Sequence, residues 1–275
     1  MQYDPIKKSL GSIFNNSVLL RILFYKLLDM LLLRSWHIRR EIKHWAANAG
    51  DNEMILDAGA GFGQYIHYLS GLNRNWNILG IDVKDEQVED CNIFFSKTCH
   101  PEKVKFMVAD LVTFVNPATY DLILSVDVME HILEDEKVFE NFCISLKSEG
   151  VLLISTPSDQ GGSDVHHKED HSFIDEHVRD GYNISDIRIK LQKAGFSDII
   201  AHYSYGKPGK ISWKLSMKYP ITLLNISKLF FIIIPFYYII TFPFCLLLNW
   251  LDLSGNHNTG TGLIVKAIKH GKDIR

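Results

Sequence analysis

The sequence lacks an excess of basic residues. Its 29 Lys and Arg residues are outnumbered by 32 Asp and Glu residues, so the formal net charge is −3 at pH 7. Proteins that bind nucleic acid attract its phosphate backbone with a basic face. We therefore expect no nucleic-acid partner.

Cysteine is also scarce, and the four cysteines include no Cys-x-x-Cys pair. This argues against a zinc ribbon and against the dense disulfide framework of a small secreted domain. The N-terminal region lacks the form of a signal peptide, because charged residues interrupt its apolar stretch after Val18. We expect a cytoplasmic protein whose thiols are reduced and buried. The cysteines are Cys91, Cys99, Cys143 and Cys245.

Short apolar runs alternate with amphipathic stretches through the middle of the chain, and no internal repeat or low-complexity linker divides them. The apolar runs predict buried strands, and the stretches between them, such as 64–70 and 135–147, predict helices. Strands that alternate with helices form a parallel sheet covered on both faces. We therefore expect an α/β fold with a doubly wound sheet. Its first five strands are predicted in "MILDAGAGFG", "WNILGIDV", "VKFMVADL", "YDLILSVDV" and "GVLLISTP".

Glycines and an acidic residue gather at the expected carboxyl ends of these strands, which is where such sheets bind ligands. Gly59, Gly61 and Gly63 follow the first strand and let the backbone approach a ligand closely. The third glycine of a dinucleotide fingerprint is missing, because Gln64 stands in its place. Asp82 ends the second strand, where it can accept hydrogen bonds from both hydroxyls of a ribose. These features predict a pocket for an adenosine-bearing ligand.

Two further aspartates belong to the same set. Asp57 lies at the end of the first strand and suits an ammonium group, while Asp110 ends the third strand and can meet an exocyclic amine. Each aspartate alone would be an ordinary helix cap or surface charge. Three of them at successive strand ends, beside a glycine turn, predict that the ligand has a cationic part.

The ordered segments "MILDAGAGFGQY", "LGIDV", "VADL", "DLILSVDVMEHI" and "LKSEGVLLISTP" resemble the motifs of class I S-adenosylmethionine-dependent methyltransferases of the type 11-like kind, over residues 54–196. The resemblance implies a Rossmann-like sheet, mostly parallel with an antiparallel last strand, and S-adenosylmethionine as the cofactor. "AGFSDIIAHYS" and "GTGLIVKAIK" resemble the last two strands of that sheet. The family further implies that Asp57 and the glycine turn flank the methionine part, that Asp82 holds the ribose, and that Asp110 with Leu111 lies against the adenine. The implied cofactor-binding residues are Asp57, Gly59, Ala60, Gly61, Gly63, Asp82, Val83, Asp110, Leu111, Ser125 and Val126.

Two residues after the fourth strand are candidates for proton transfer. Methyl transfer needs a base only when the acceptor loses a proton as it attacks. His131 is the first candidate because an imidazole titrates near neutral pH, and Glu130 lies beside it. The alternative that this pair only orders the loop stays open. Asp127 completes a D-x-x-E-H pattern similar to the metal site of some methyltransferases, but its first position departs from that pattern and we expect no metal.

A loop rich in glycine, serine and histidine follows the fifth strand. It contains His166, His167 and His171 without the fixed spacing of a metal site, so it predicts a loop at the acceptor site. An amphipathic helix is expected after this loop, with Asn183 or Ser185 as its N-cap.

No charged side chain occurs from Leu229 to Leu251, a run as long as a membrane-spanning helix. A single crossing would separate the last strand from the sheet that it must join, so the segment has to return to the side it left. Lysines flank the run on both sides, which favours cytoplasmic flanks. Pro235 and Pro243 lie within the run and predict a re-entrant or in-plane hairpin there.

A second apolar segment lies near the N-terminus. Residues 18–33 predict a helix that is apolar over most of its circumference, with Arg21, Lys26 and Arg34 at its edge. We expect the two apolar segments to form a monotopic platform at the cytoplasmic face of a membrane, with a helical lid or a dimer interface as the alternatives. The expected organisation is a helical cap over 1–50, a Rossmann-like domain over 51–206, an apolar insert over 207–258 and the closing strand within 259–275.

The sequence thus predicts a methyltransferase that acts on an oxygen or carbon nucleophile of a small amphiphilic or membrane-associated acceptor, such as a lipid, a quinone-like ring or a lipid-linked glycan. One alternative is the same chemistry on a soluble small molecule, with the apolar segments as a lid or interface. A second alternative is a methyltransferase-like module that binds without turnover. A nicotinamide oxidoreductase is disfavoured, because Asp57 would lie close to where that fingerprint brings a pyrophosphate.

Overall fold

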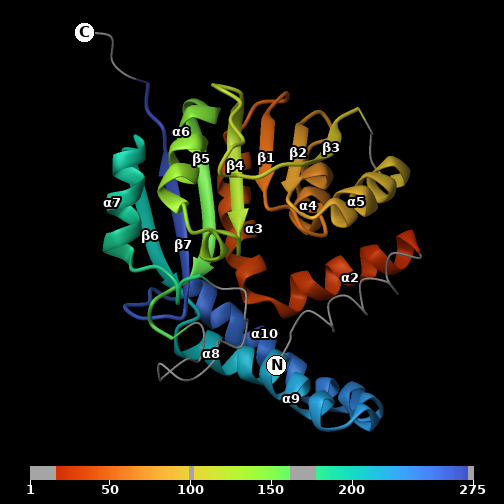
Figure 1. Cartoon of the computed structure of the whole chain (residues 1–275). Helices are drawn as coiled ribbons and strands as arrows, with labels where there is room; N and C mark the ends of the chain where they lie inside the picture. Colours follow the sequence, from red (N-terminus) through yellow and green to blue (C-terminus); the bar gives the residue numbers. More distant parts are fainter. Residues whose placement is uncertain (1–16, 99–101, 162–177, 272–275) are drawn as a thin grey trace.

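The computed structural model describes residues 17–98, 102–161 and 178–271, and a seven-stranded sheet forms its centre (Figure 1). The strand order is β3-β2-β1-β4-β5-β7-β6, and only β7 runs antiparallel to its neighbours. The predicted Rossmann-like methyltransferase sheet, with its antiparallel last strand, is confirmed. The strands are β1 (Met54–Ala58), β2 (Asn77–Asp82), β3 (Val104–Val108), β4 (Tyr120–Val126), β5 (Leu146–Pro157), β6 (Asp198–Ser204) and β7 (Gly262–Ile268).

Helices cover both faces of this sheet, which explains why its central strands are apolar without alternation. One core forms where Ile38, Ile66 and Phe95 pack against the sheet, and a second forms around Phe139 and Leu191 on the other face. On the first face lie α3 (Leu33–Ala46), α4 (Gln64–Leu72) and α5 (Asp85–Thr98), and on the second lie α6 (Asp135–Ser145) and α7 (Ile184–Ala194). The Asn183 side chain accepts a hydrogen bond from the Ser185 amide and caps α7, as one of the two predicted caps.

The N-terminal apolar segment forms α2 (Val18–Leu31), and Leu32, which has extended backbone, separates it from α3. Two of the three cations expected at the edge of this helix contact other parts of the protein. Arg21 is buried, and Arg34 forms an ion pair with Asp127. The sequence pattern did not reveal these contacts, because the partners are distant in the chain.

The C-terminal apolar segment is a helical hairpin that leaves the sheet after β6 and returns to it before β7. The return to the same side agrees with the prediction, but the turn is not where it was expected. The outgoing limb lies upstream of the uncharged run, and the return limb passes through Pro243 as one helix. Its elements are α8 (Lys207–Trp213), the π-helical turn η2 (Lys214–Lys218), α9 (Tyr219–Ile226), the 3-10 turn η3 (Lys228–Ile232) and α10 (Ile234–Ser254).

The two limbs of this hairpin are joined by hydrogen bonds that account for its path. A π-helical turn leaves carbonyl groups free for side chains, and those of Leu215 and Ser216 accept bonds from the hydroxyls of Tyr237 (2.7 Å) and Tyr238 (2.6 Å). Pro235 lies in the first turn of α10, where its missing N–H costs little. Among the described residues, one helix is long enough and apolar enough to cross a membrane. This helix is α10, with a mean hydropathy of 1.6.

A buried carboxylate connects the hairpin to the rest of the protein. Asp252, in the last turn of α10, has no exposed surface. Its Oδ1 atom lies 3.1 Å from His37 Nε2 on α3 and accepts a hydrogen bond from the Tyr205 amide (3.2 Å). Its Oδ2 atom accepts a hydrogen bond from the Gly209 amide (3.0 Å). His257 lies 3.3 Å away. One side chain therefore links the N-terminal cap, the sheet edge and both limbs of the hairpin.

Candidate active site

The glycine turn lies where the strand order reverses, between β1 and β4, which is the ligand-binding position of such sheets. Gly59, Gly61 and Gly63 all have positive φ, a conformation that glycine adopts without strain. A Cβ on Gly59 would lie 2.3 Å from Val128, whereas one on Gly61 would meet no atom of the described residues within 4 Å. The turn therefore packs tightly at Gly59 and leaves open space beside Gly61.

Asp82 and Asp110 stand at the ends of neighbouring strands, as predicted. Asp82 accepts hydrogen bonds from the amides of Gly61 (2.9 Å) and Lys84 (3.0 Å), which fixes its carboxylate at the rim of the open space. Asp110 is exposed and accepts a bond from the Val112 amide (2.9 Å). Each carboxylate keeps lone pairs for a ligand hydroxyl or amine. Beside them, Val83 is exposed, while Leu111 and Ala60 are buried.

Asp57, one of the predicted site residues, is buried without a full set of partners. Its side chain is 1% exposed, and its Oδ2 atom has no hydrogen-bond partner among the described residues. Burial, together with the charge of Asp82, raises its pKa to about 7. On β4, the neighbour of β1, the buried Ser125 hydroxyl likewise has no partner within the described chain, and Val126 is half-buried. Orphaned polar atoms beside an open glycine turn fit a bound polar ligand such as S-adenosylmethionine.

The D-x-x-E-H residues follow β4, but they do not act as one group. Asp127, at a positive φ of 53°, forms its ion pair with Arg34, whereas Glu130 is buried and accepts a hydrogen bond from Thr156 Oγ1 (3.1 Å). Burial, then the charge of Asp127, raises the pKa of Glu130 to about 8. With a pKa near 8, the Glu130 carboxyl group is mostly protonated at pH 7, and the ionised fraction that can act as a base grows as pH rises. His131 ends the 3-10 turn η1 (Met129–His131) and is half-buried.

No group of three or more His, Cys, Asp or Glu side chains able to hold a metal occurs among the described residues. The three histidines of the loop after the fifth strand lie outside that part of the chain.

Two tyrosines near Arg34 and Asp127 were not predicted. Tyr65 follows the glycine turn, and its hydroxyl lies 3.4 Å from Ser35 Oγ; Tyr205 follows β6, and its hydroxyl accepts a bond from the Arg34 amide (3.1 Å). Burial raises the pKa of Tyr65 to about 12 and also raises that of Tyr205, so both stay protonated. The only sequence signal was that Tyr65 is the last residue of the motif segment "MILDAGAGFGQY".

Arg21 and Tyr25 of α2 hold the glycine turn from outside. The Tyr25 hydroxyl donates to the Phe62 carbonyl, which also accepts from Arg21 (3.0 Å). Arg21 further donates to the Tyr25 hydroxyl (2.8 Å) and to Cys91 Sγ (3.0 Å). The cap therefore fixes the turn directly, which the apolar pattern of the helix did not reveal.

The glycine turn and the strand-end aspartates of this site lie within a region that matches known proteins. A family profile described as a methyltransferase domain matches residues 49–195. Phosphoethanolamine N-methyltransferase of Triticum aestivum is 30% identical over 54% of this chain and 29% of its own length. The ubiquinone biosynthesis O-methyltransferase of Rickettsia prowazekii is 28% identical over 46% of this chain and 50% of its own length. The chain thus spans half or less of these curated relatives.

A solved structure shares the fold at low identity. Haemonchus contortus phosphoethanolamine N-methyltransferase 2, in complex with phosphomonomethylethanolamine and S-adenosylhomocysteine, has a TM-score of 0.58 at 17% identity, covering 86% of this chain and 53% of that protein. The profile match covers more than half of the chain and coincides with the glycine turn and the three strand-end aspartates. The chain therefore belongs to the methyltransferase domain family, within the class I S-adenosylmethionine-dependent methyltransferases.

Proposed function

We propose that this protein transfers a methyl group from S-adenosylmethionine to an oxygen or carbon nucleophile of a small amphiphilic acceptor. The observation that carries the proposal is the orphaned, buried carboxylate of Asp57 beside the open space at Gly61. A carboxylate whose pKa is raised by burial is stabilised in its charged form by a nearby cation. The ammonium group of S-adenosylmethionine supplies that cation.

The strand ends provide the remaining contacts for the cofactor. Asp82 lies at the rim where the ribose hydroxyls would bind, and Asp110 with Leu111 lies where the adenine would bind. The cofactor supplies an activated methyl group when it is bound, so the protein's own task is to orient the acceptor and exclude water. His131 is the proposed base for an acceptor that loses a proton.

The acceptor side of the site consists of Arg34, Asp127, Tyr65 and Tyr205. The two tyrosines can donate hydrogen bonds because they stay protonated. The Rickettsia relative is named for a quinone pathway and the wheat relative for a phosphorylated amine. We favour an acceptor with an apolar part, because the apolar surface next to the site is large.

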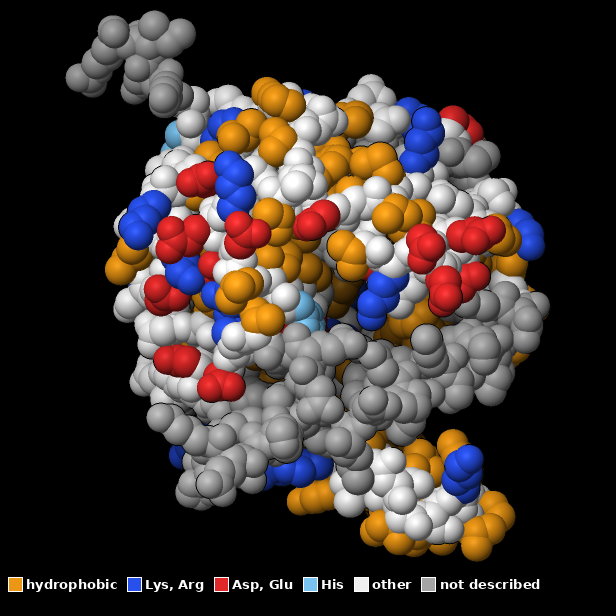
Figure 2. Space-filling model, viewed as in Figure 1, with side chains coloured by type: hydrophobic (Ala, Val, Ile, Leu, Met, Phe, Trp, Pro, Cys, Tyr) orange, Lys and Arg blue, Asp and Glu red, His pale blue; other side chains and the backbone are white. Residues whose placement is uncertain are grey.

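That surface lies on the hairpin, where Figure 2 shows apolar side chains around its tip, and on α2, where Leu19 and Leu23 are exposed. Exposed apolar side chains recur every three or four residues along α10, so they form one strip along the helix. We propose that the strip lies in the plane of a membrane at its cytoplasmic face, because an exposed apolar surface of this extent marks an interaction site. The strip consists of Phe236, Ile239, Ile240, Phe244, Leu247, Trp250 and Leu251.

The proposal is tested by incubating the purified protein and methyl-labelled S-adenosylmethionine with separated membrane and soluble extracts, followed by partition into organic solvent. Label in the organic phase from membranes supports an amphiphilic acceptor. Label confined to the aqueous phase from soluble extract supports the alternative, in which the apolar segments are a lid or a dimer interface. Binding of S-adenosylhomocysteine without transfer to any extract would favour a non-catalytic module.

A further inference from the structure

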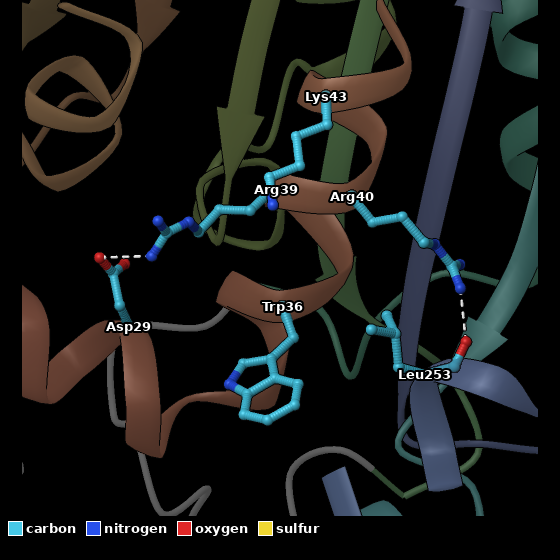
Figure 3. A pocket seen from close by; sticks show the side chains of 6 residues that line it. All are labelled: Asp29, Trp36, Arg39, Arg40, Lys43 and Leu253. Atoms are coloured by element: carbon cyan, nitrogen blue, oxygen red, sulfur yellow. Dashed lines mark hydrogen bonds and ion pairs between the residues drawn. The ribbon is translucent and has the colours of Figure 1, made fainter. Parts of the chain in front are cut away.

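A basic cavity opens where α2, α3 and the end of α10 meet (Figure 3). Its volume is about 370 Å³, within the range of small-molecule sites. The lining side chains carry three cations and one carboxylate. They are Asp29, Trp36, Arg39, Arg40, Lys43 and Leu253.

Helical periodicity brings the cations together. Trp36, Arg39, Arg40 and Lys43 are spaced as i, i+3, i+4 and i+7, so they lie on one face of α3. Side chains of a helix tilt toward its N-terminus, which directs Lys43 back over Arg39, as Figure 3 shows. The opposite face of α3 packs on the sheet through residues such as Ile38.

The cations are only partly neutralised. Arg39 forms an ion pair with Asp29 (2.7 Å) and stacks on Tyr68, while Arg40 donates to the carbonyl of Leu253 and lies 3.4 Å from Glu41. A guanidinium has five N–H donors, so both arginines retain donors for another group. Lys43 is exposed and has no carboxylate partner within the described chain. The cavity is therefore suited to an anion.

Apolar side chains border the same cavity. Met30, next to Asp29 on α2, is 39% exposed, and Trp250, one turn before Leu253 on α10, is 56% exposed. The Trp36 indole lines the cavity (Figure 3), and its Nε1 donates a hydrogen bond to the Met30 carbonyl (3.3 Å). Tryptophan is enriched at the headgroup level of membranes, and its neighbours here continue into the apolar strip of α10.

We propose that this cavity binds the phosphate headgroup of an anionic phospholipid, whose acyl chains follow the apolar surfaces of α2 and α10. The inference deepens the proposed membrane contact and rests on it for the source of the ligand. It assigns the anion to Arg39, Arg40 and Lys43, and the start of the acyl chains to Trp36 and Leu253. A lipid bound here would set the height of the strand-end site above the bilayer.

The test is a calorimetric titration of the full chain with short-chain phosphatidylglycerol below its micelle concentration. We expect saturable binding of one lipid per chain, weaker binding of short-chain phosphatidylcholine, and no competition from inorganic phosphate. A basic residue near an anionic membrane contributes about fivefold in affinity. Lys43→Gln should therefore weaken phosphatidylglycerol binding about fivefold, and Lys43→Glu more than tenfold.

Lys193→Gln and Lys193→Glu are the matched controls, because Lys193 is also an exposed lysine in the last turn of a helix. They should bind the lipid as the unmodified protein does. Equal losses at Lys193 and Lys43, or normal binding by Lys43→Glu, would overturn the proposal. Competition by inorganic phosphate would assign the cavity to a soluble phosphate and overturn the lipid assignment.

Vesicles of neutral phosphatidylcholine separate this inference from the membrane proposal itself. If the protein binds no vesicles but still binds short-chain phosphatidylglycerol, the platform is refuted and the cavity assignment stands. Vesicle binding that is indifferent to phosphatidylglycerol, with no short-chain binding, would refute the cavity alone.

Discussion

At the residue scale, the site depends on ionisable groups whose surroundings disfavour charge. Asp57 and Glu130 are both buried, and burial is the main cause of the raised pKa of each. In the unoccupied protein these carboxyl groups oppose folding once they ionise. A bound cation relieves this cost at Asp57, so cofactor affinity and pH are linked there.

The pH dependence of stability provides a test of Asp57. Its pKa is about 7 when folded and near 3.8 when unfolded, so the unfolded chain holds fewer protons between about pH 4 and pH 7. The free energy of unfolding must therefore fall as pH rises through that window and level off above it. From pH 5 to pH 8, the free energy of unfolding of Asp57→Asn should rise by about 2 to 3 kcal/mol relative to that of the unmodified protein. Urea unfolding measures this difference. Asp51→Asn, at an exposed position, should show no such gain.

Removal of the Asp82 carboxylate tests the proposed ribose contact. Asp82→Ala should weaken S-adenosylmethionine binding by about 1.5 to 3 kcal/mol, because charged hydrogen bonds to the ligand are lost. Asp82→Asn keeps an acceptor for the Gly61 amide and should lose less. Calorimetric titration measures both, and Asp85→Ala on α5 is the control. An unchanged affinity of Asp82→Ala would refute the ribose assignment.

Substitutions of Glu130 and His131, which follow β4, test which of the two residues acts as the base. Burial raises the pKa of Glu130 to about 8, so the group is mostly protonated at pH 7 and Glu130→Gln should keep turnover within a few-fold of normal at that pH. His131→Ala should lower turnover by about 10²-fold and leave S-adenosylhomocysteine affinity intact, since a general base contributes about that much. A normal rate for His131→Ala would remove His131 from the mechanism.

At the element scale, the hairpin is a long insertion between adjacent strands that a few buried polar contacts hold in place. The hydroxyls of Tyr237 and Tyr238 join its limbs, and Asp252 joins its base to α3 and to the sheet edge. Such contacts fix orientation more than they add stability, because taking each polar group out of water offsets much of its gain. The hairpin should therefore respond strongly to loss of one partner at its base.

Asp252→Asn tests the connection at the base of the hairpin. Its loss of charge removes the ionic contribution to the His37 contact while the shape of the side chain is kept. We expect a loss of about 2 to 4 kcal/mol of stability and faster hydrogen exchange along α8 and α10. Asp186→Asn removes an exposed carboxylate from its pair with Lys190, which keeps Asp135 as a partner, and should change stability by less than about 1 kcal/mol. Equal effects of the two substitutions would argue against a special role for Asp252.

At the scale of the whole molecule, the apolar helices lie at the end of the sheet where the parallel strands terminate (Figure 1). The carboxyl ends of β1, β2 and β4 face α2 and the base of the hairpin, which would let an amphiphilic acceptor move from the apolar surface to the cofactor. A soluble acceptor would not require this arrangement.

The membrane contact is tested by placing a charge on the apolar strip. Phe244 is 60% exposed on α10, and Phe244→Asp should lower binding to neutral phosphatidylcholine vesicles by about tenfold or more, because inserting a phenylalanine contributes about 1.5 to 3 kcal/mol. Sedimentation with vesicles measures this effect. Ile189→Asp, at an exposed position of α7, is the control. Both variants should bind S-adenosylhomocysteine normally, and equal vesicle binding by both would contradict the platform.

The sequence by itself determined the sheet and the position of three acidic residues at its strand ends. The strands could be predicted because short apolar runs that alternate with amphipathic stretches form buried strands in an α/β chain. Asp57, Asp82 and Asp110 could be placed at strand ends because they directly follow or end these runs in the sequence. The fold, including its antiparallel last strand, agrees with what the motifs implied.

Only the tertiary structure decided the roles of residues whose partners are distant in the chain. Arg21 reaches Phe62, Arg34 reaches Asp127, and Asp252 reaches His37, across separations that no local pattern encodes. The turn of the hairpin was misplaced for the same reason. A proline predicts a break from local geometry, but the packing of α10 on α8 is a long-range contribution that keeps the helix continuous through Pro243.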